Sequence, residues 1–564
     1  MKKRFFQILL ILALCGLLPT TTHATEGHAN HYNCGTVNCT DTNHDHTTID
    51  AWTAWDGTTI LADGVSYYLA GDVVVSETVQ IAANTTVNLC LNGYKLELQL
   101  AEGEFGSVIE IDNGATLNLC DCYNGESKYT VDDPAKDDNS TIAIPGGVLT
   151  GGNERDATYG GGVDTSGTFT MYSGSIAGNS GNGVYNIDYG DDSRGKFTMY
   201  GGLITGNRAF SGGGVDNNGT FTMLGGTISG NYATDWNSSS GVINTGEMTM
   251  SNNAEVSGNY GGGVHNLDGV LVLSGNAKIS DNHGTGIDND FRGSAVITIA
   301  DSVKISGNRG SGVYNDGGIV TMTGGSISQN VAFTGGGVNN EDGVFTMKGG
   351  SISENIADYG GGVYNGIGTL YLSGGSITGN SAYREGGGVC YGHDEIYLSG
   401  SIVITDNTAN GNASNLSTGS FTVNGALDAE ARIGVSLNSN ITYIGRGGHV
   451  FIRPDGTNVS SLAEYAGCFF SDNDDRYYLK EEDGVLKLHE ISAAFVYGYL
   501  KVTITEPELL NQVVIFAAGY EDGRMVESHM AYDLTQFPMN ERDSIRVFIL
   551  DRNTFVPLFR EIAL

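Results

Sequence analysis

The feature that most constrains the fold is a repeat of about 25 residues in the middle of the chain. A group of the form Gly-x-Gly followed by valine or isoleucine, diverged in places, occurs ten times, with neighbouring copies 21 to 31 residues apart. Such a repeat is typical of solenoids, in which each copy packs only against its two neighbours. The aligned residues are Val163, Val184, Val215, Val242, Val264, Ile287, Val313, Val338, Val363 and Val389.

Each copy contains three short runs that predict β-strands. They resemble GVYN, TFTM and ISGN, and the second alternates apolar residues with threonine, the period-two pattern of a strand. Glycines separate the runs, and no run is long enough for a helix. The chain has 85 glycines and only 7 prolines, so glycine serves the turns of a folded repeat. We therefore predict an all-β fold, a right-handed parallel β-helix with three strands per coil.

Two columns of asparagine support this prediction. One stands two residues after the repeat valine in eight of ten copies, and the other ends the third strand in all ten. Identical amides at strand spacing form hydrogen-bonded ladders, which supply partners to each buried amide. We therefore interpret both columns as structural. The first contains Asn186, Asn217, Asn244, Asn266, Asn289, Asn315, Asn340 and Asn365, and the second contains Asn179, Asn207, Asn231, Asn259, Asn282, Asn308, Asn330, Asn355, Asn380 and Asn407.

Four segments are predicted along the chain. Residues 1–24 have the basic start, apolar stretch and small-residue cleavage site of a secretory signal peptide. Residues 25–60 are rich in cysteine and histidine, and residues 61–490 form the β-helix, with regular coils at about 140–410. In residues 491–564 the repeat is absent, and apolar runs joined by polar turns predict a small C-terminal all-β module.

Charge and cysteine content narrow the class of protein. The chain has 28 basic and 64 acidic residues, a formal net charge of −36 at pH 7, which disfavours nucleic acid as a partner. No stretch after the signal peptide is apolar over the length of a transmembrane helix. Seven of the eight cysteines lie beyond the signal peptide, and an odd number argues against a full disulfide framework. We expect a secreted protein that is extracellular or associated with the cell surface.

A family resemblance rests on the motif Ile-x-x-Asn followed by Gly-Gly-x-Val, as in Ile352–Asn355 and Gly360–Val363. This motif resembles the repeat pair of polymorphic outer membrane proteins. The complete repeat also resembles the β-helix repeats of adhesin-like surface proteins of anaerobic bacteria. The resemblance covers about residues 140–410 and implies a pectate-lyase-like solenoid with a role in adhesion and surface exposure.

A group of metal-ligand residues stands in the sequence HANHYNCGTVNCTDTNHDH, just after the signal peptide. Thiolate and imidazole ligands suit a tetrahedral zinc ion, and a closed set of four would make the zinc structural. The candidate ligands are Cys34, Cys39, His44 and His46. Two other interpretations stay open, namely a disulfide between Cys34 and Cys39, or a histidine-rich tail that binds no metal.

The residue directly after each repeat valine is polar and varied. If the valine points into the coil, these residues point outward along one sheet face, where carbohydrate-active β-helices carry their sites. An enzyme would use Asp164, Asp216, His265 and Asp288. The first two lie two coils apart, about 9.6 Å, at the upper limit for inverting glycoside hydrolysis. Chance polar residues on an exposed face look the same, so we favour no catalytic residues and keep this set for the enzyme alternative.

Loops before the repeat valine differ in length. Three consecutive coils have tight loops, at 259–264, 282–287 and 308–313, and the flanking coils have longer loops with aromatic residues. The longer loops would wall a shallow saddle whose aromatic side chains stack on sugars or anchor a protein. Alternatively, each aromatic folds back over its own coil. The candidate binding residues are Phe210, Tyr232, Trp236, Phe333, Tyr359 and Tyr383.

Together these patterns favour a non-catalytic, adhesin-like protein that binds a polysaccharide or a host or cell-surface protein. The alternative is a polysaccharide lyase or glycoside hydrolase acting on the exposed sheet face. Fold alone does not separate the two classes. Apart from the zinc, no cofactor is expected.

Overall fold

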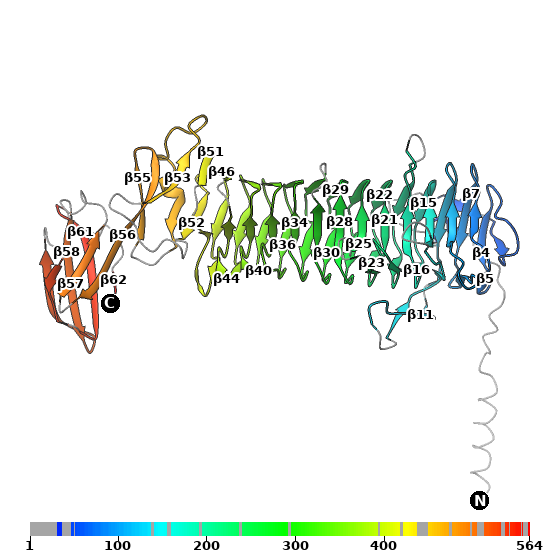
Figure 1. Cartoon of the computed structure of the whole chain (residues 1–564), viewed down its shortest axis with the longest axis horizontal. Coiled ribbons are helices and arrows are strands. Elements are labelled where there is room, and N and C mark those ends of the chain that lie inside the picture. Colours follow the sequence, from blue (N-terminus) through cyan, green and yellow to red (C-terminus); the bar gives the residue numbers. More distant parts are fainter. Residues whose placement is uncertain are drawn as a thin grey trace, which may run out of the picture.

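The computed structural model shows an elongated molecule built almost entirely of β-strands (Figure 1). Its main body is a right-handed parallel β-helix of about 13 turns, which confirms the fold predicted from the repeat. The residues described are 31–35, 47–49 and 51–563, the last range with gaps at 124, 137–139, 155–159, 191–193, 236–239, 291–294, 393–394, 418–420, 437–448, 473–476, 497–498, 505–512, 532–535, 541, 554 and 556–561.

One coil of the repeat contains three strands, β37 (Val338–Asn340), β38 (Val344–Met347) and β39 (Ser351–Ser353). Each pairs in parallel with the equivalent strand of the next coil, so that Val338 stands opposite Val363. First and third strands belong to one large sheet, and second strands to another. The other first strands are β14 (Gly161–Thr165), β17 (Asn182–Asn186), β21 (Val215–Asn217), β25 (Ser240–Asn244), β28 (Gly262–Leu267), β31 (Ile287–Asp290), β34 (Val313–Asn315), β41 (Val363–Asn365) and β45 (Val389–Tyr391).

The core lies inside the coils and is filled by alternate strand residues. In β38, Phe345 and Met347 are fully buried, whereas the two residues between and before them are half-buried. The same position holds Phe169, Phe197 and Phe221 in successive coils, and their stacked rings lie 5.0 and 4.6 Å apart. Burial of each such side chain contributes about 1.5–3 kcal/mol.

Both asparagine columns form ladders. In the first, each amide nitrogen donates to Oδ1 of the next asparagine at 2.6 to 2.9 Å, from Asn186 to Asn365. The second runs from Asn179 at 2.8 to 3.1 Å and continues beyond the repeat to Asn415. There Asn415 donates to Asp472 Oδ1 at 2.6 Å. The ladder residues are buried, and neighbouring amides satisfy one another except at the start of the first column, where Asn186 Oδ1 has no hydrogen-bond partner among the described residues.

The glycine directly before the repeat valine is present in all ten copies because the coils approach closely there. A Cβ atom added to Gly312 would lie 2.4 Å from Ile327 Cγ2 and 2.7 Å from the carbonyl oxygen of Gly337 in the next coil. Only a residue without a side chain fits such an approach. The repeated glycine is therefore a packing requirement of the stack.

The irregular segment before the repeat also forms coils. Strands β7 (Thr86–Cys90) and β10 (Thr116–Cys120) pair in parallel, with Cys120 opposite Cys90. Parallel pairing begins still earlier, at β3 (Thr53–Trp55). The solenoid sheet therefore includes residues before position 61.

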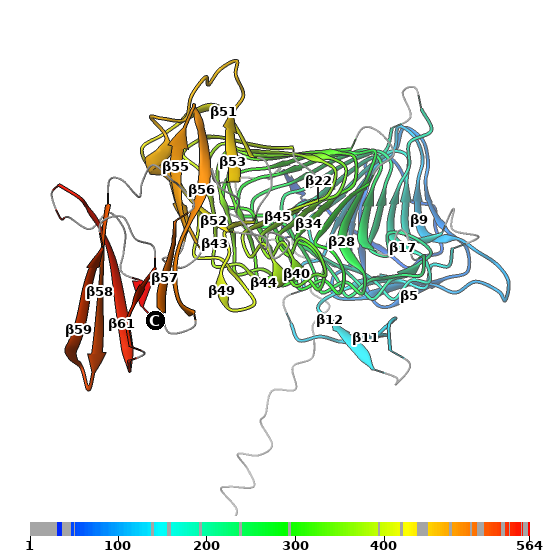
Figure 2. The same cartoon turned by 60° about the vertical axis from the view of Figure 1, so that its left-hand side comes forward.

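A small all-β module follows the β-helix (Figures 1 and 2). Its core is separate and includes β58 (Val513–Glu521) and β61 (Ser544–Asp551), which pair antiparallel. The long strand β56 (Val485–Val496) crosses the predicted boundary at residue 491. It supplies Leu486 to the β-helix core and Ala493 to the module core, so one continuous strand joins the two.

Residues 1–24, the predicted signal peptide, lie outside the described residues. Within the part of the chain that the structure describes, no helix is long and apolar enough to cross a membrane. The one helix described there is a short 3-10 turn, η1 (Ala466–Cys468).

Candidate functional site

The residues after the repeat valines form one continuous column across ten strands, as predicted. Parallel register places them side by side outside the coil, while the valines lie in the core. The column extends upstream to Glu110, which stands opposite Asp164. Its ten predicted members are Asp164, Tyr185, Asp216, Ile243, His265, Asp288, Tyr314, Asn339, Tyr364 and Cys390.

The column is less open than expected, because every member is buried or half-buried. Asp164 is 5% exposed and His265 4% exposed. The loops before two of the strands fold over the face: the Gly160 N–H donates to Asp164 Oδ2 at 3.1 Å, and Ser211 Oγ donates to Asp216 Oδ2 at 3.3 Å. These two loops cover part of the column against a polymer that would lie along it.

Burial raises the pKa of the column carboxyls. Loss of hydration raises the pKa of Asp164 to about 6 and that of Asp216 to about 7, although hydrogen bonds to each partly oppose the change. The pKa of Asp288 is also raised to about 6 by burial, and nearby His265 opposes the change. A carboxyl group that titrates near neutral pH can act as a general acid. The raised pKa values of these three residues are therefore compatible with acid catalysis.

The four residues of the enzyme alternative do not form one centre. Asp164 and Asp216 flank Tyr185, whereas His265 and Asp288 are direct neighbours in a different part of the column. Five strand steps separate Asp164 from Asp288, about 24 Å. The structure therefore divides the set into two distant groups.

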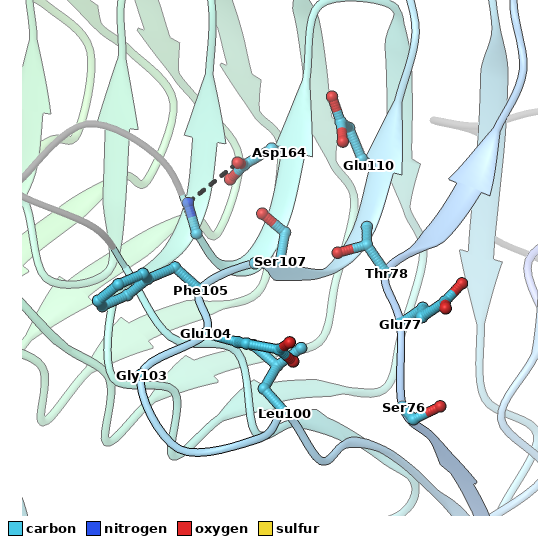
Figure 3. Close-up of a pocket in the computed structure, with 12 residues that line it drawn as sticks. Ser76, Glu77, Thr78, Leu100, Gly103, Glu104, Phe105, Ser107, Glu110 and Asp164 are labelled. Atoms are coloured by element: carbon cyan, nitrogen blue, oxygen red, sulfur yellow. Dashed lines mark hydrogen bonds between the residues drawn. The ribbon is translucent and has the colours of Figure 1, made fainter.

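A pocket of about 660 Å³ opens beside Asp164, at the N-terminal end of the column. Figure 3 shows Asp164 bonded to the Gly160 backbone, with Ser107 and Glu110 on the neighbouring strand and Phe105 at the rim. Carboxylates and one aromatic ring in a pocket suit a polar, sugar-like ligand. The sequence did not reveal this pocket, because its other residues come from irregular coils.

Of the predicted binding aromatics, Tyr232, Tyr359 and Tyr383 lie on the short strands β24 (Tyr232–Ala233), β40 (Ile356–Tyr359) and β44 (Ser381–Glu385), and Phe210 and Phe333 lie in loops. Phe333 is 70% and Tyr383 68% exposed, so these two do not fold back onto their own coils, and Phe210 is 47% exposed. Tyr232 and Tyr359 are half-buried. Trp236 lies outside the described residues.

Phe333, Tyr359, Tyr383 and Arg384 form what we name the aromatic loop surface. Strands β40 (Ile356–Tyr359) and β44 (Ser381–Glu385) pair in parallel beneath it. The Phe333 and Tyr359 rings meet edge to face, with centroids 6.2 Å apart. The Arg384 guanidinium lies 5.5 Å from the Tyr359 ring centroid, and its Nη1 donates to the Tyr359 hydroxyl at 3.3 Å. These contacts fix the orientation of Tyr359.

The predicted metal ligands fall mostly outside the described residues. Cys34 is described and buried, but Cys39, His44 and His46 are not described. A different group is brought together instead: the ligand atoms of His31, Cys90 and Cys120 all lie within 4.8 Å of one another. That group could not be found from spacing, because its members are far apart in the sequence.

Comparisons with known proteins found no matching family model, no matching curated protein and no matching solved structure. The likeness of the repeat to polymorphic outer membrane proteins thus stays a resemblance of sequence pattern. Function has to be argued from the arrangement of residues on this fold.

Proposed function

We propose that this protein is a secreted or cell-surface, adhesin-like protein that binds a glycan or a protein ligand without catalysis. The observation that carries the proposal is the aromatic loop surface, where Phe333 and Tyr383 stay about two-thirds exposed on an ordered scaffold. Exposed aromatic rings beside an arginine stack on sugar rings or anchor a protein partner. The resemblance of the repeat to adhesin-like surface proteins agrees with this role.

Local order makes the surface suitable for recognition. Tyr359 is held by Phe333 on one side and by Arg384 on the other, and Arg384 Nε lies 3.6 Å from Asp358 Oδ2. A ligand that meets a preorganised side chain loses less conformational entropy on binding than one that must order it. The column on the sheet face is largely covered, which favours the loops over the column as the contact surface.

The test is a double variant, Tyr359→Ala with Tyr383→Ala, assayed on a glycan array and on intact cells. We expect binding to fall at least tenfold, or about 1.4 kcal/mol or more, because the rings supply the contact area. The matched control is Tyr371→Ala with Tyr397→Ala, a stacked pair on the second strands of two successive coils. If both double variants bind like the unaltered protein, the aromatic loop surface is not the binding site.

The pocket beside Asp164 supports a second candidate, a polysaccharide-degrading enzyme. Asp164 has a pKa raised to about 6 by burial, and Glu110 stands opposite it on the neighbouring strand, so one carboxyl could donate a proton while the other is ionised. A screen of acidic and neutral glycans for new reducing ends or unsaturated products tests this. Turnover that disappears in Asp164→Asn would establish catalysis and replace the first proposal.

A further inference from the structure

Three ligand-type side chains from separate parts of the chain meet at one corner of the early coils. His31 lies on β1 (His31–Tyr32), and Cys90 and Cys120 end the neighbouring strands β7 and β10. Their ligand atoms lie within 4.8 Å of one another, and all three residues are buried. Thiolates and imidazole are the ligand types that bind zinc in structural sites.

A candidate fourth ligand stands beside one member of this group. Cys122 Sγ lies 3.6 Å from Cys90 Sγ, and two thiolates bound to one zinc at about 2.3 Å are about 3.8 Å apart at the tetrahedral angle. Cys122 lies outside the group of three, so its side chain would have to move toward His31 and Cys120 to complete the set. The buried Cys34 lies in the same neighbourhood, since the adjacent Gly35 packs against Cys120. A disulfide would use only two of these groups, whereas a metal ion uses the imidazole and the thiols together.

The surroundings hold the ligands in orientation. His31 Nδ1 is 2.5 Å from the Tyr32 carbonyl oxygen, which places the ring proton on Nδ1 and makes Nε2 the nitrogen with a lone pair for a metal. Between the two cysteines of Cys120-Asp121-Cys122, the carboxylate of Asp121 accepts hydrogen bonds from the backbone N–H groups of Gly93 and Gly147, both at 2.7 Å. Such contacts behind the ligands are typical of metal sites.

We infer that His31, Cys90, Cys120 and Cys122 bind one structural zinc ion that fastens the N-terminal segment to the early coils of the β-helix. In the part described, β1 pairs with the two-residue strand β2 (Thr48–Ile49) and not with a strand of the coils. Metal bonds from His31 to two stacked coils would add to the packing of the buried residues His31 and Cys34. With Cys122 as the fourth ligand, the ion would have four protein ligands and no open position, so its role would be structural.

The decisive measurement is the metal content of the full-length protein. The protein is purified without added metal and without metal-affinity chromatography. We expect about one zinc per chain in the unaltered protein and a loss of at least tenfold in Cys90→Ser with Cys120→Ser. The matched control, Cys390→Ser with Cys468→Ser, removes two cysteines elsewhere and should keep the zinc. A second comparison, Cys39→Ser with His44→Ala, should also keep it, because those residues belong to the other predicted set.

Two results would overturn the inference. Zinc that disappears in Cys39→Ser with His44→Ala but survives in Cys90→Ser with Cys120→Ser would assign the ion to the N-terminal set. A metal-free protein whose non-reduced peptides contain a disulfide among Cys90, Cys120 and Cys122 would replace the metal with a covalent link. If the cysteine variants fail to fold, cobalt(II) is added to the unaltered protein after treatment with a chelator. Tetrahedral cobalt with three thiolate ligands absorbs strongly in the visible range. A site closed by a disulfide does not bind cobalt and gives no such absorption.

Discussion

Some residues on the sheet face are both buried and ionisable, and burial disfavours their charged form. Asp164 lies in a covered position, receives a hydrogen bond from Gly160, and keeps a carboxyl group where water is largely excluded. Loss of hydration disfavours the ionised form, so its pKa rises from 3.8 to about 6. In the unfolded chain the same group would titrate near its ordinary value. Folding therefore takes up a proton at this residue between these two pH values.

This proton uptake predicts a pH-dependent effect of Asp164→Asn. The unfolded chain releases the Asp164 proton more readily, so the free energy of unfolding falls as pH rises from about 4 to 6 and stays lower above that range. Asparagine fills the same space without ionising. We expect the variant to be more stable than the unaltered protein by about 3 kcal/mol at pH 8 and to differ little at about pH 4.

Chemical denaturation at the two pH values measures this difference. The exposed Asp342→Asn is the matched control, and it should show no such dependence on pH. An Asp164→Asn variant that is less stable than the unaltered protein at pH 8 would mean that the ionised carboxylate is stabilised by its hydrogen bonds.

Within one strand and the loop before it, the close approach of neighbouring coils makes stability sensitive to substitution of the glycine before the repeat valine. We predict that Gly312→Ala destabilises the protein by about 2 kcal/mol, because the new methyl group would meet Ile327 Cγ2 and the Gly337 carbonyl oxygen below 3 Å. Thermal unfolding followed by circular dichroism measures the loss. Gly71→Ala, where an added Cβ meets nothing within 4 Å, should leave the transition nearly unchanged. A loss at Gly312 no larger than that at Gly71 would mean that the close approach of the coils does not limit the side chain at Gly312.

Elements could be predicted wherever each coil repeats the one before. Alternation predicts the strand that holds Phe345 and Met347, and recurrence predicts the ladders, because equivalent residues of stacked coils face the same neighbours. Loops lack that constraint. The burial of Asp164 and the exposure of Tyr383 depend on the conformation of the neighbouring loops. The loop sequences are not periodic, so no repeated pattern predicts that conformation.

The candidate sites were predicted only in part for the same reason. Asp164 could be placed in the column, but its opposite residue Glu110 lies in a coil without the repeat motif, so their pairing was not foreseen. The approach of His31 to Cys90 and Cys120 is a contact between distant segments. Contacts of that kind depend on tertiary packing, which has no local signature.

The whole molecule is a stack, and its stability is a sum over coils and their interfaces. We predict that deletion of residues 314–363 leaves a folded protein that is shorter by about 9.6 Å. The junction places Tyr364 and Asn365 after Val313, where Tyr314 and Asn315 stood, so the strand and its ladder residue are restored. Spin labels on either side of the deletion measure the shortening.

A deletion that breaks the coil register is the control for that experiment. Removal of residues 314–351 would join Val313 to Ile352, a first strand to a third strand, and we expect loss of the cooperative unfolding transition. The in-register deletion also removes Phe333 and Tyr359, so it should keep the fold and lose ligand binding. Retained binding in the shortened rod would place the contact surface elsewhere.

The direction of the second ladder explains how the ladder ends. Each amide donates toward the C-terminal side, so the last one, Asn415, presents donors where the next ladder asparagine would stand. Asp472 meets them with a carboxylate, which when ionised accepts hydrogen bonds and offers none. Another asparagine at this place would pass the pattern on to a further layer. Asp472 therefore ends the ladder. An asparagine side chain has an NH₂ group that could donate to a next residue, whereas an ionised carboxylate has none.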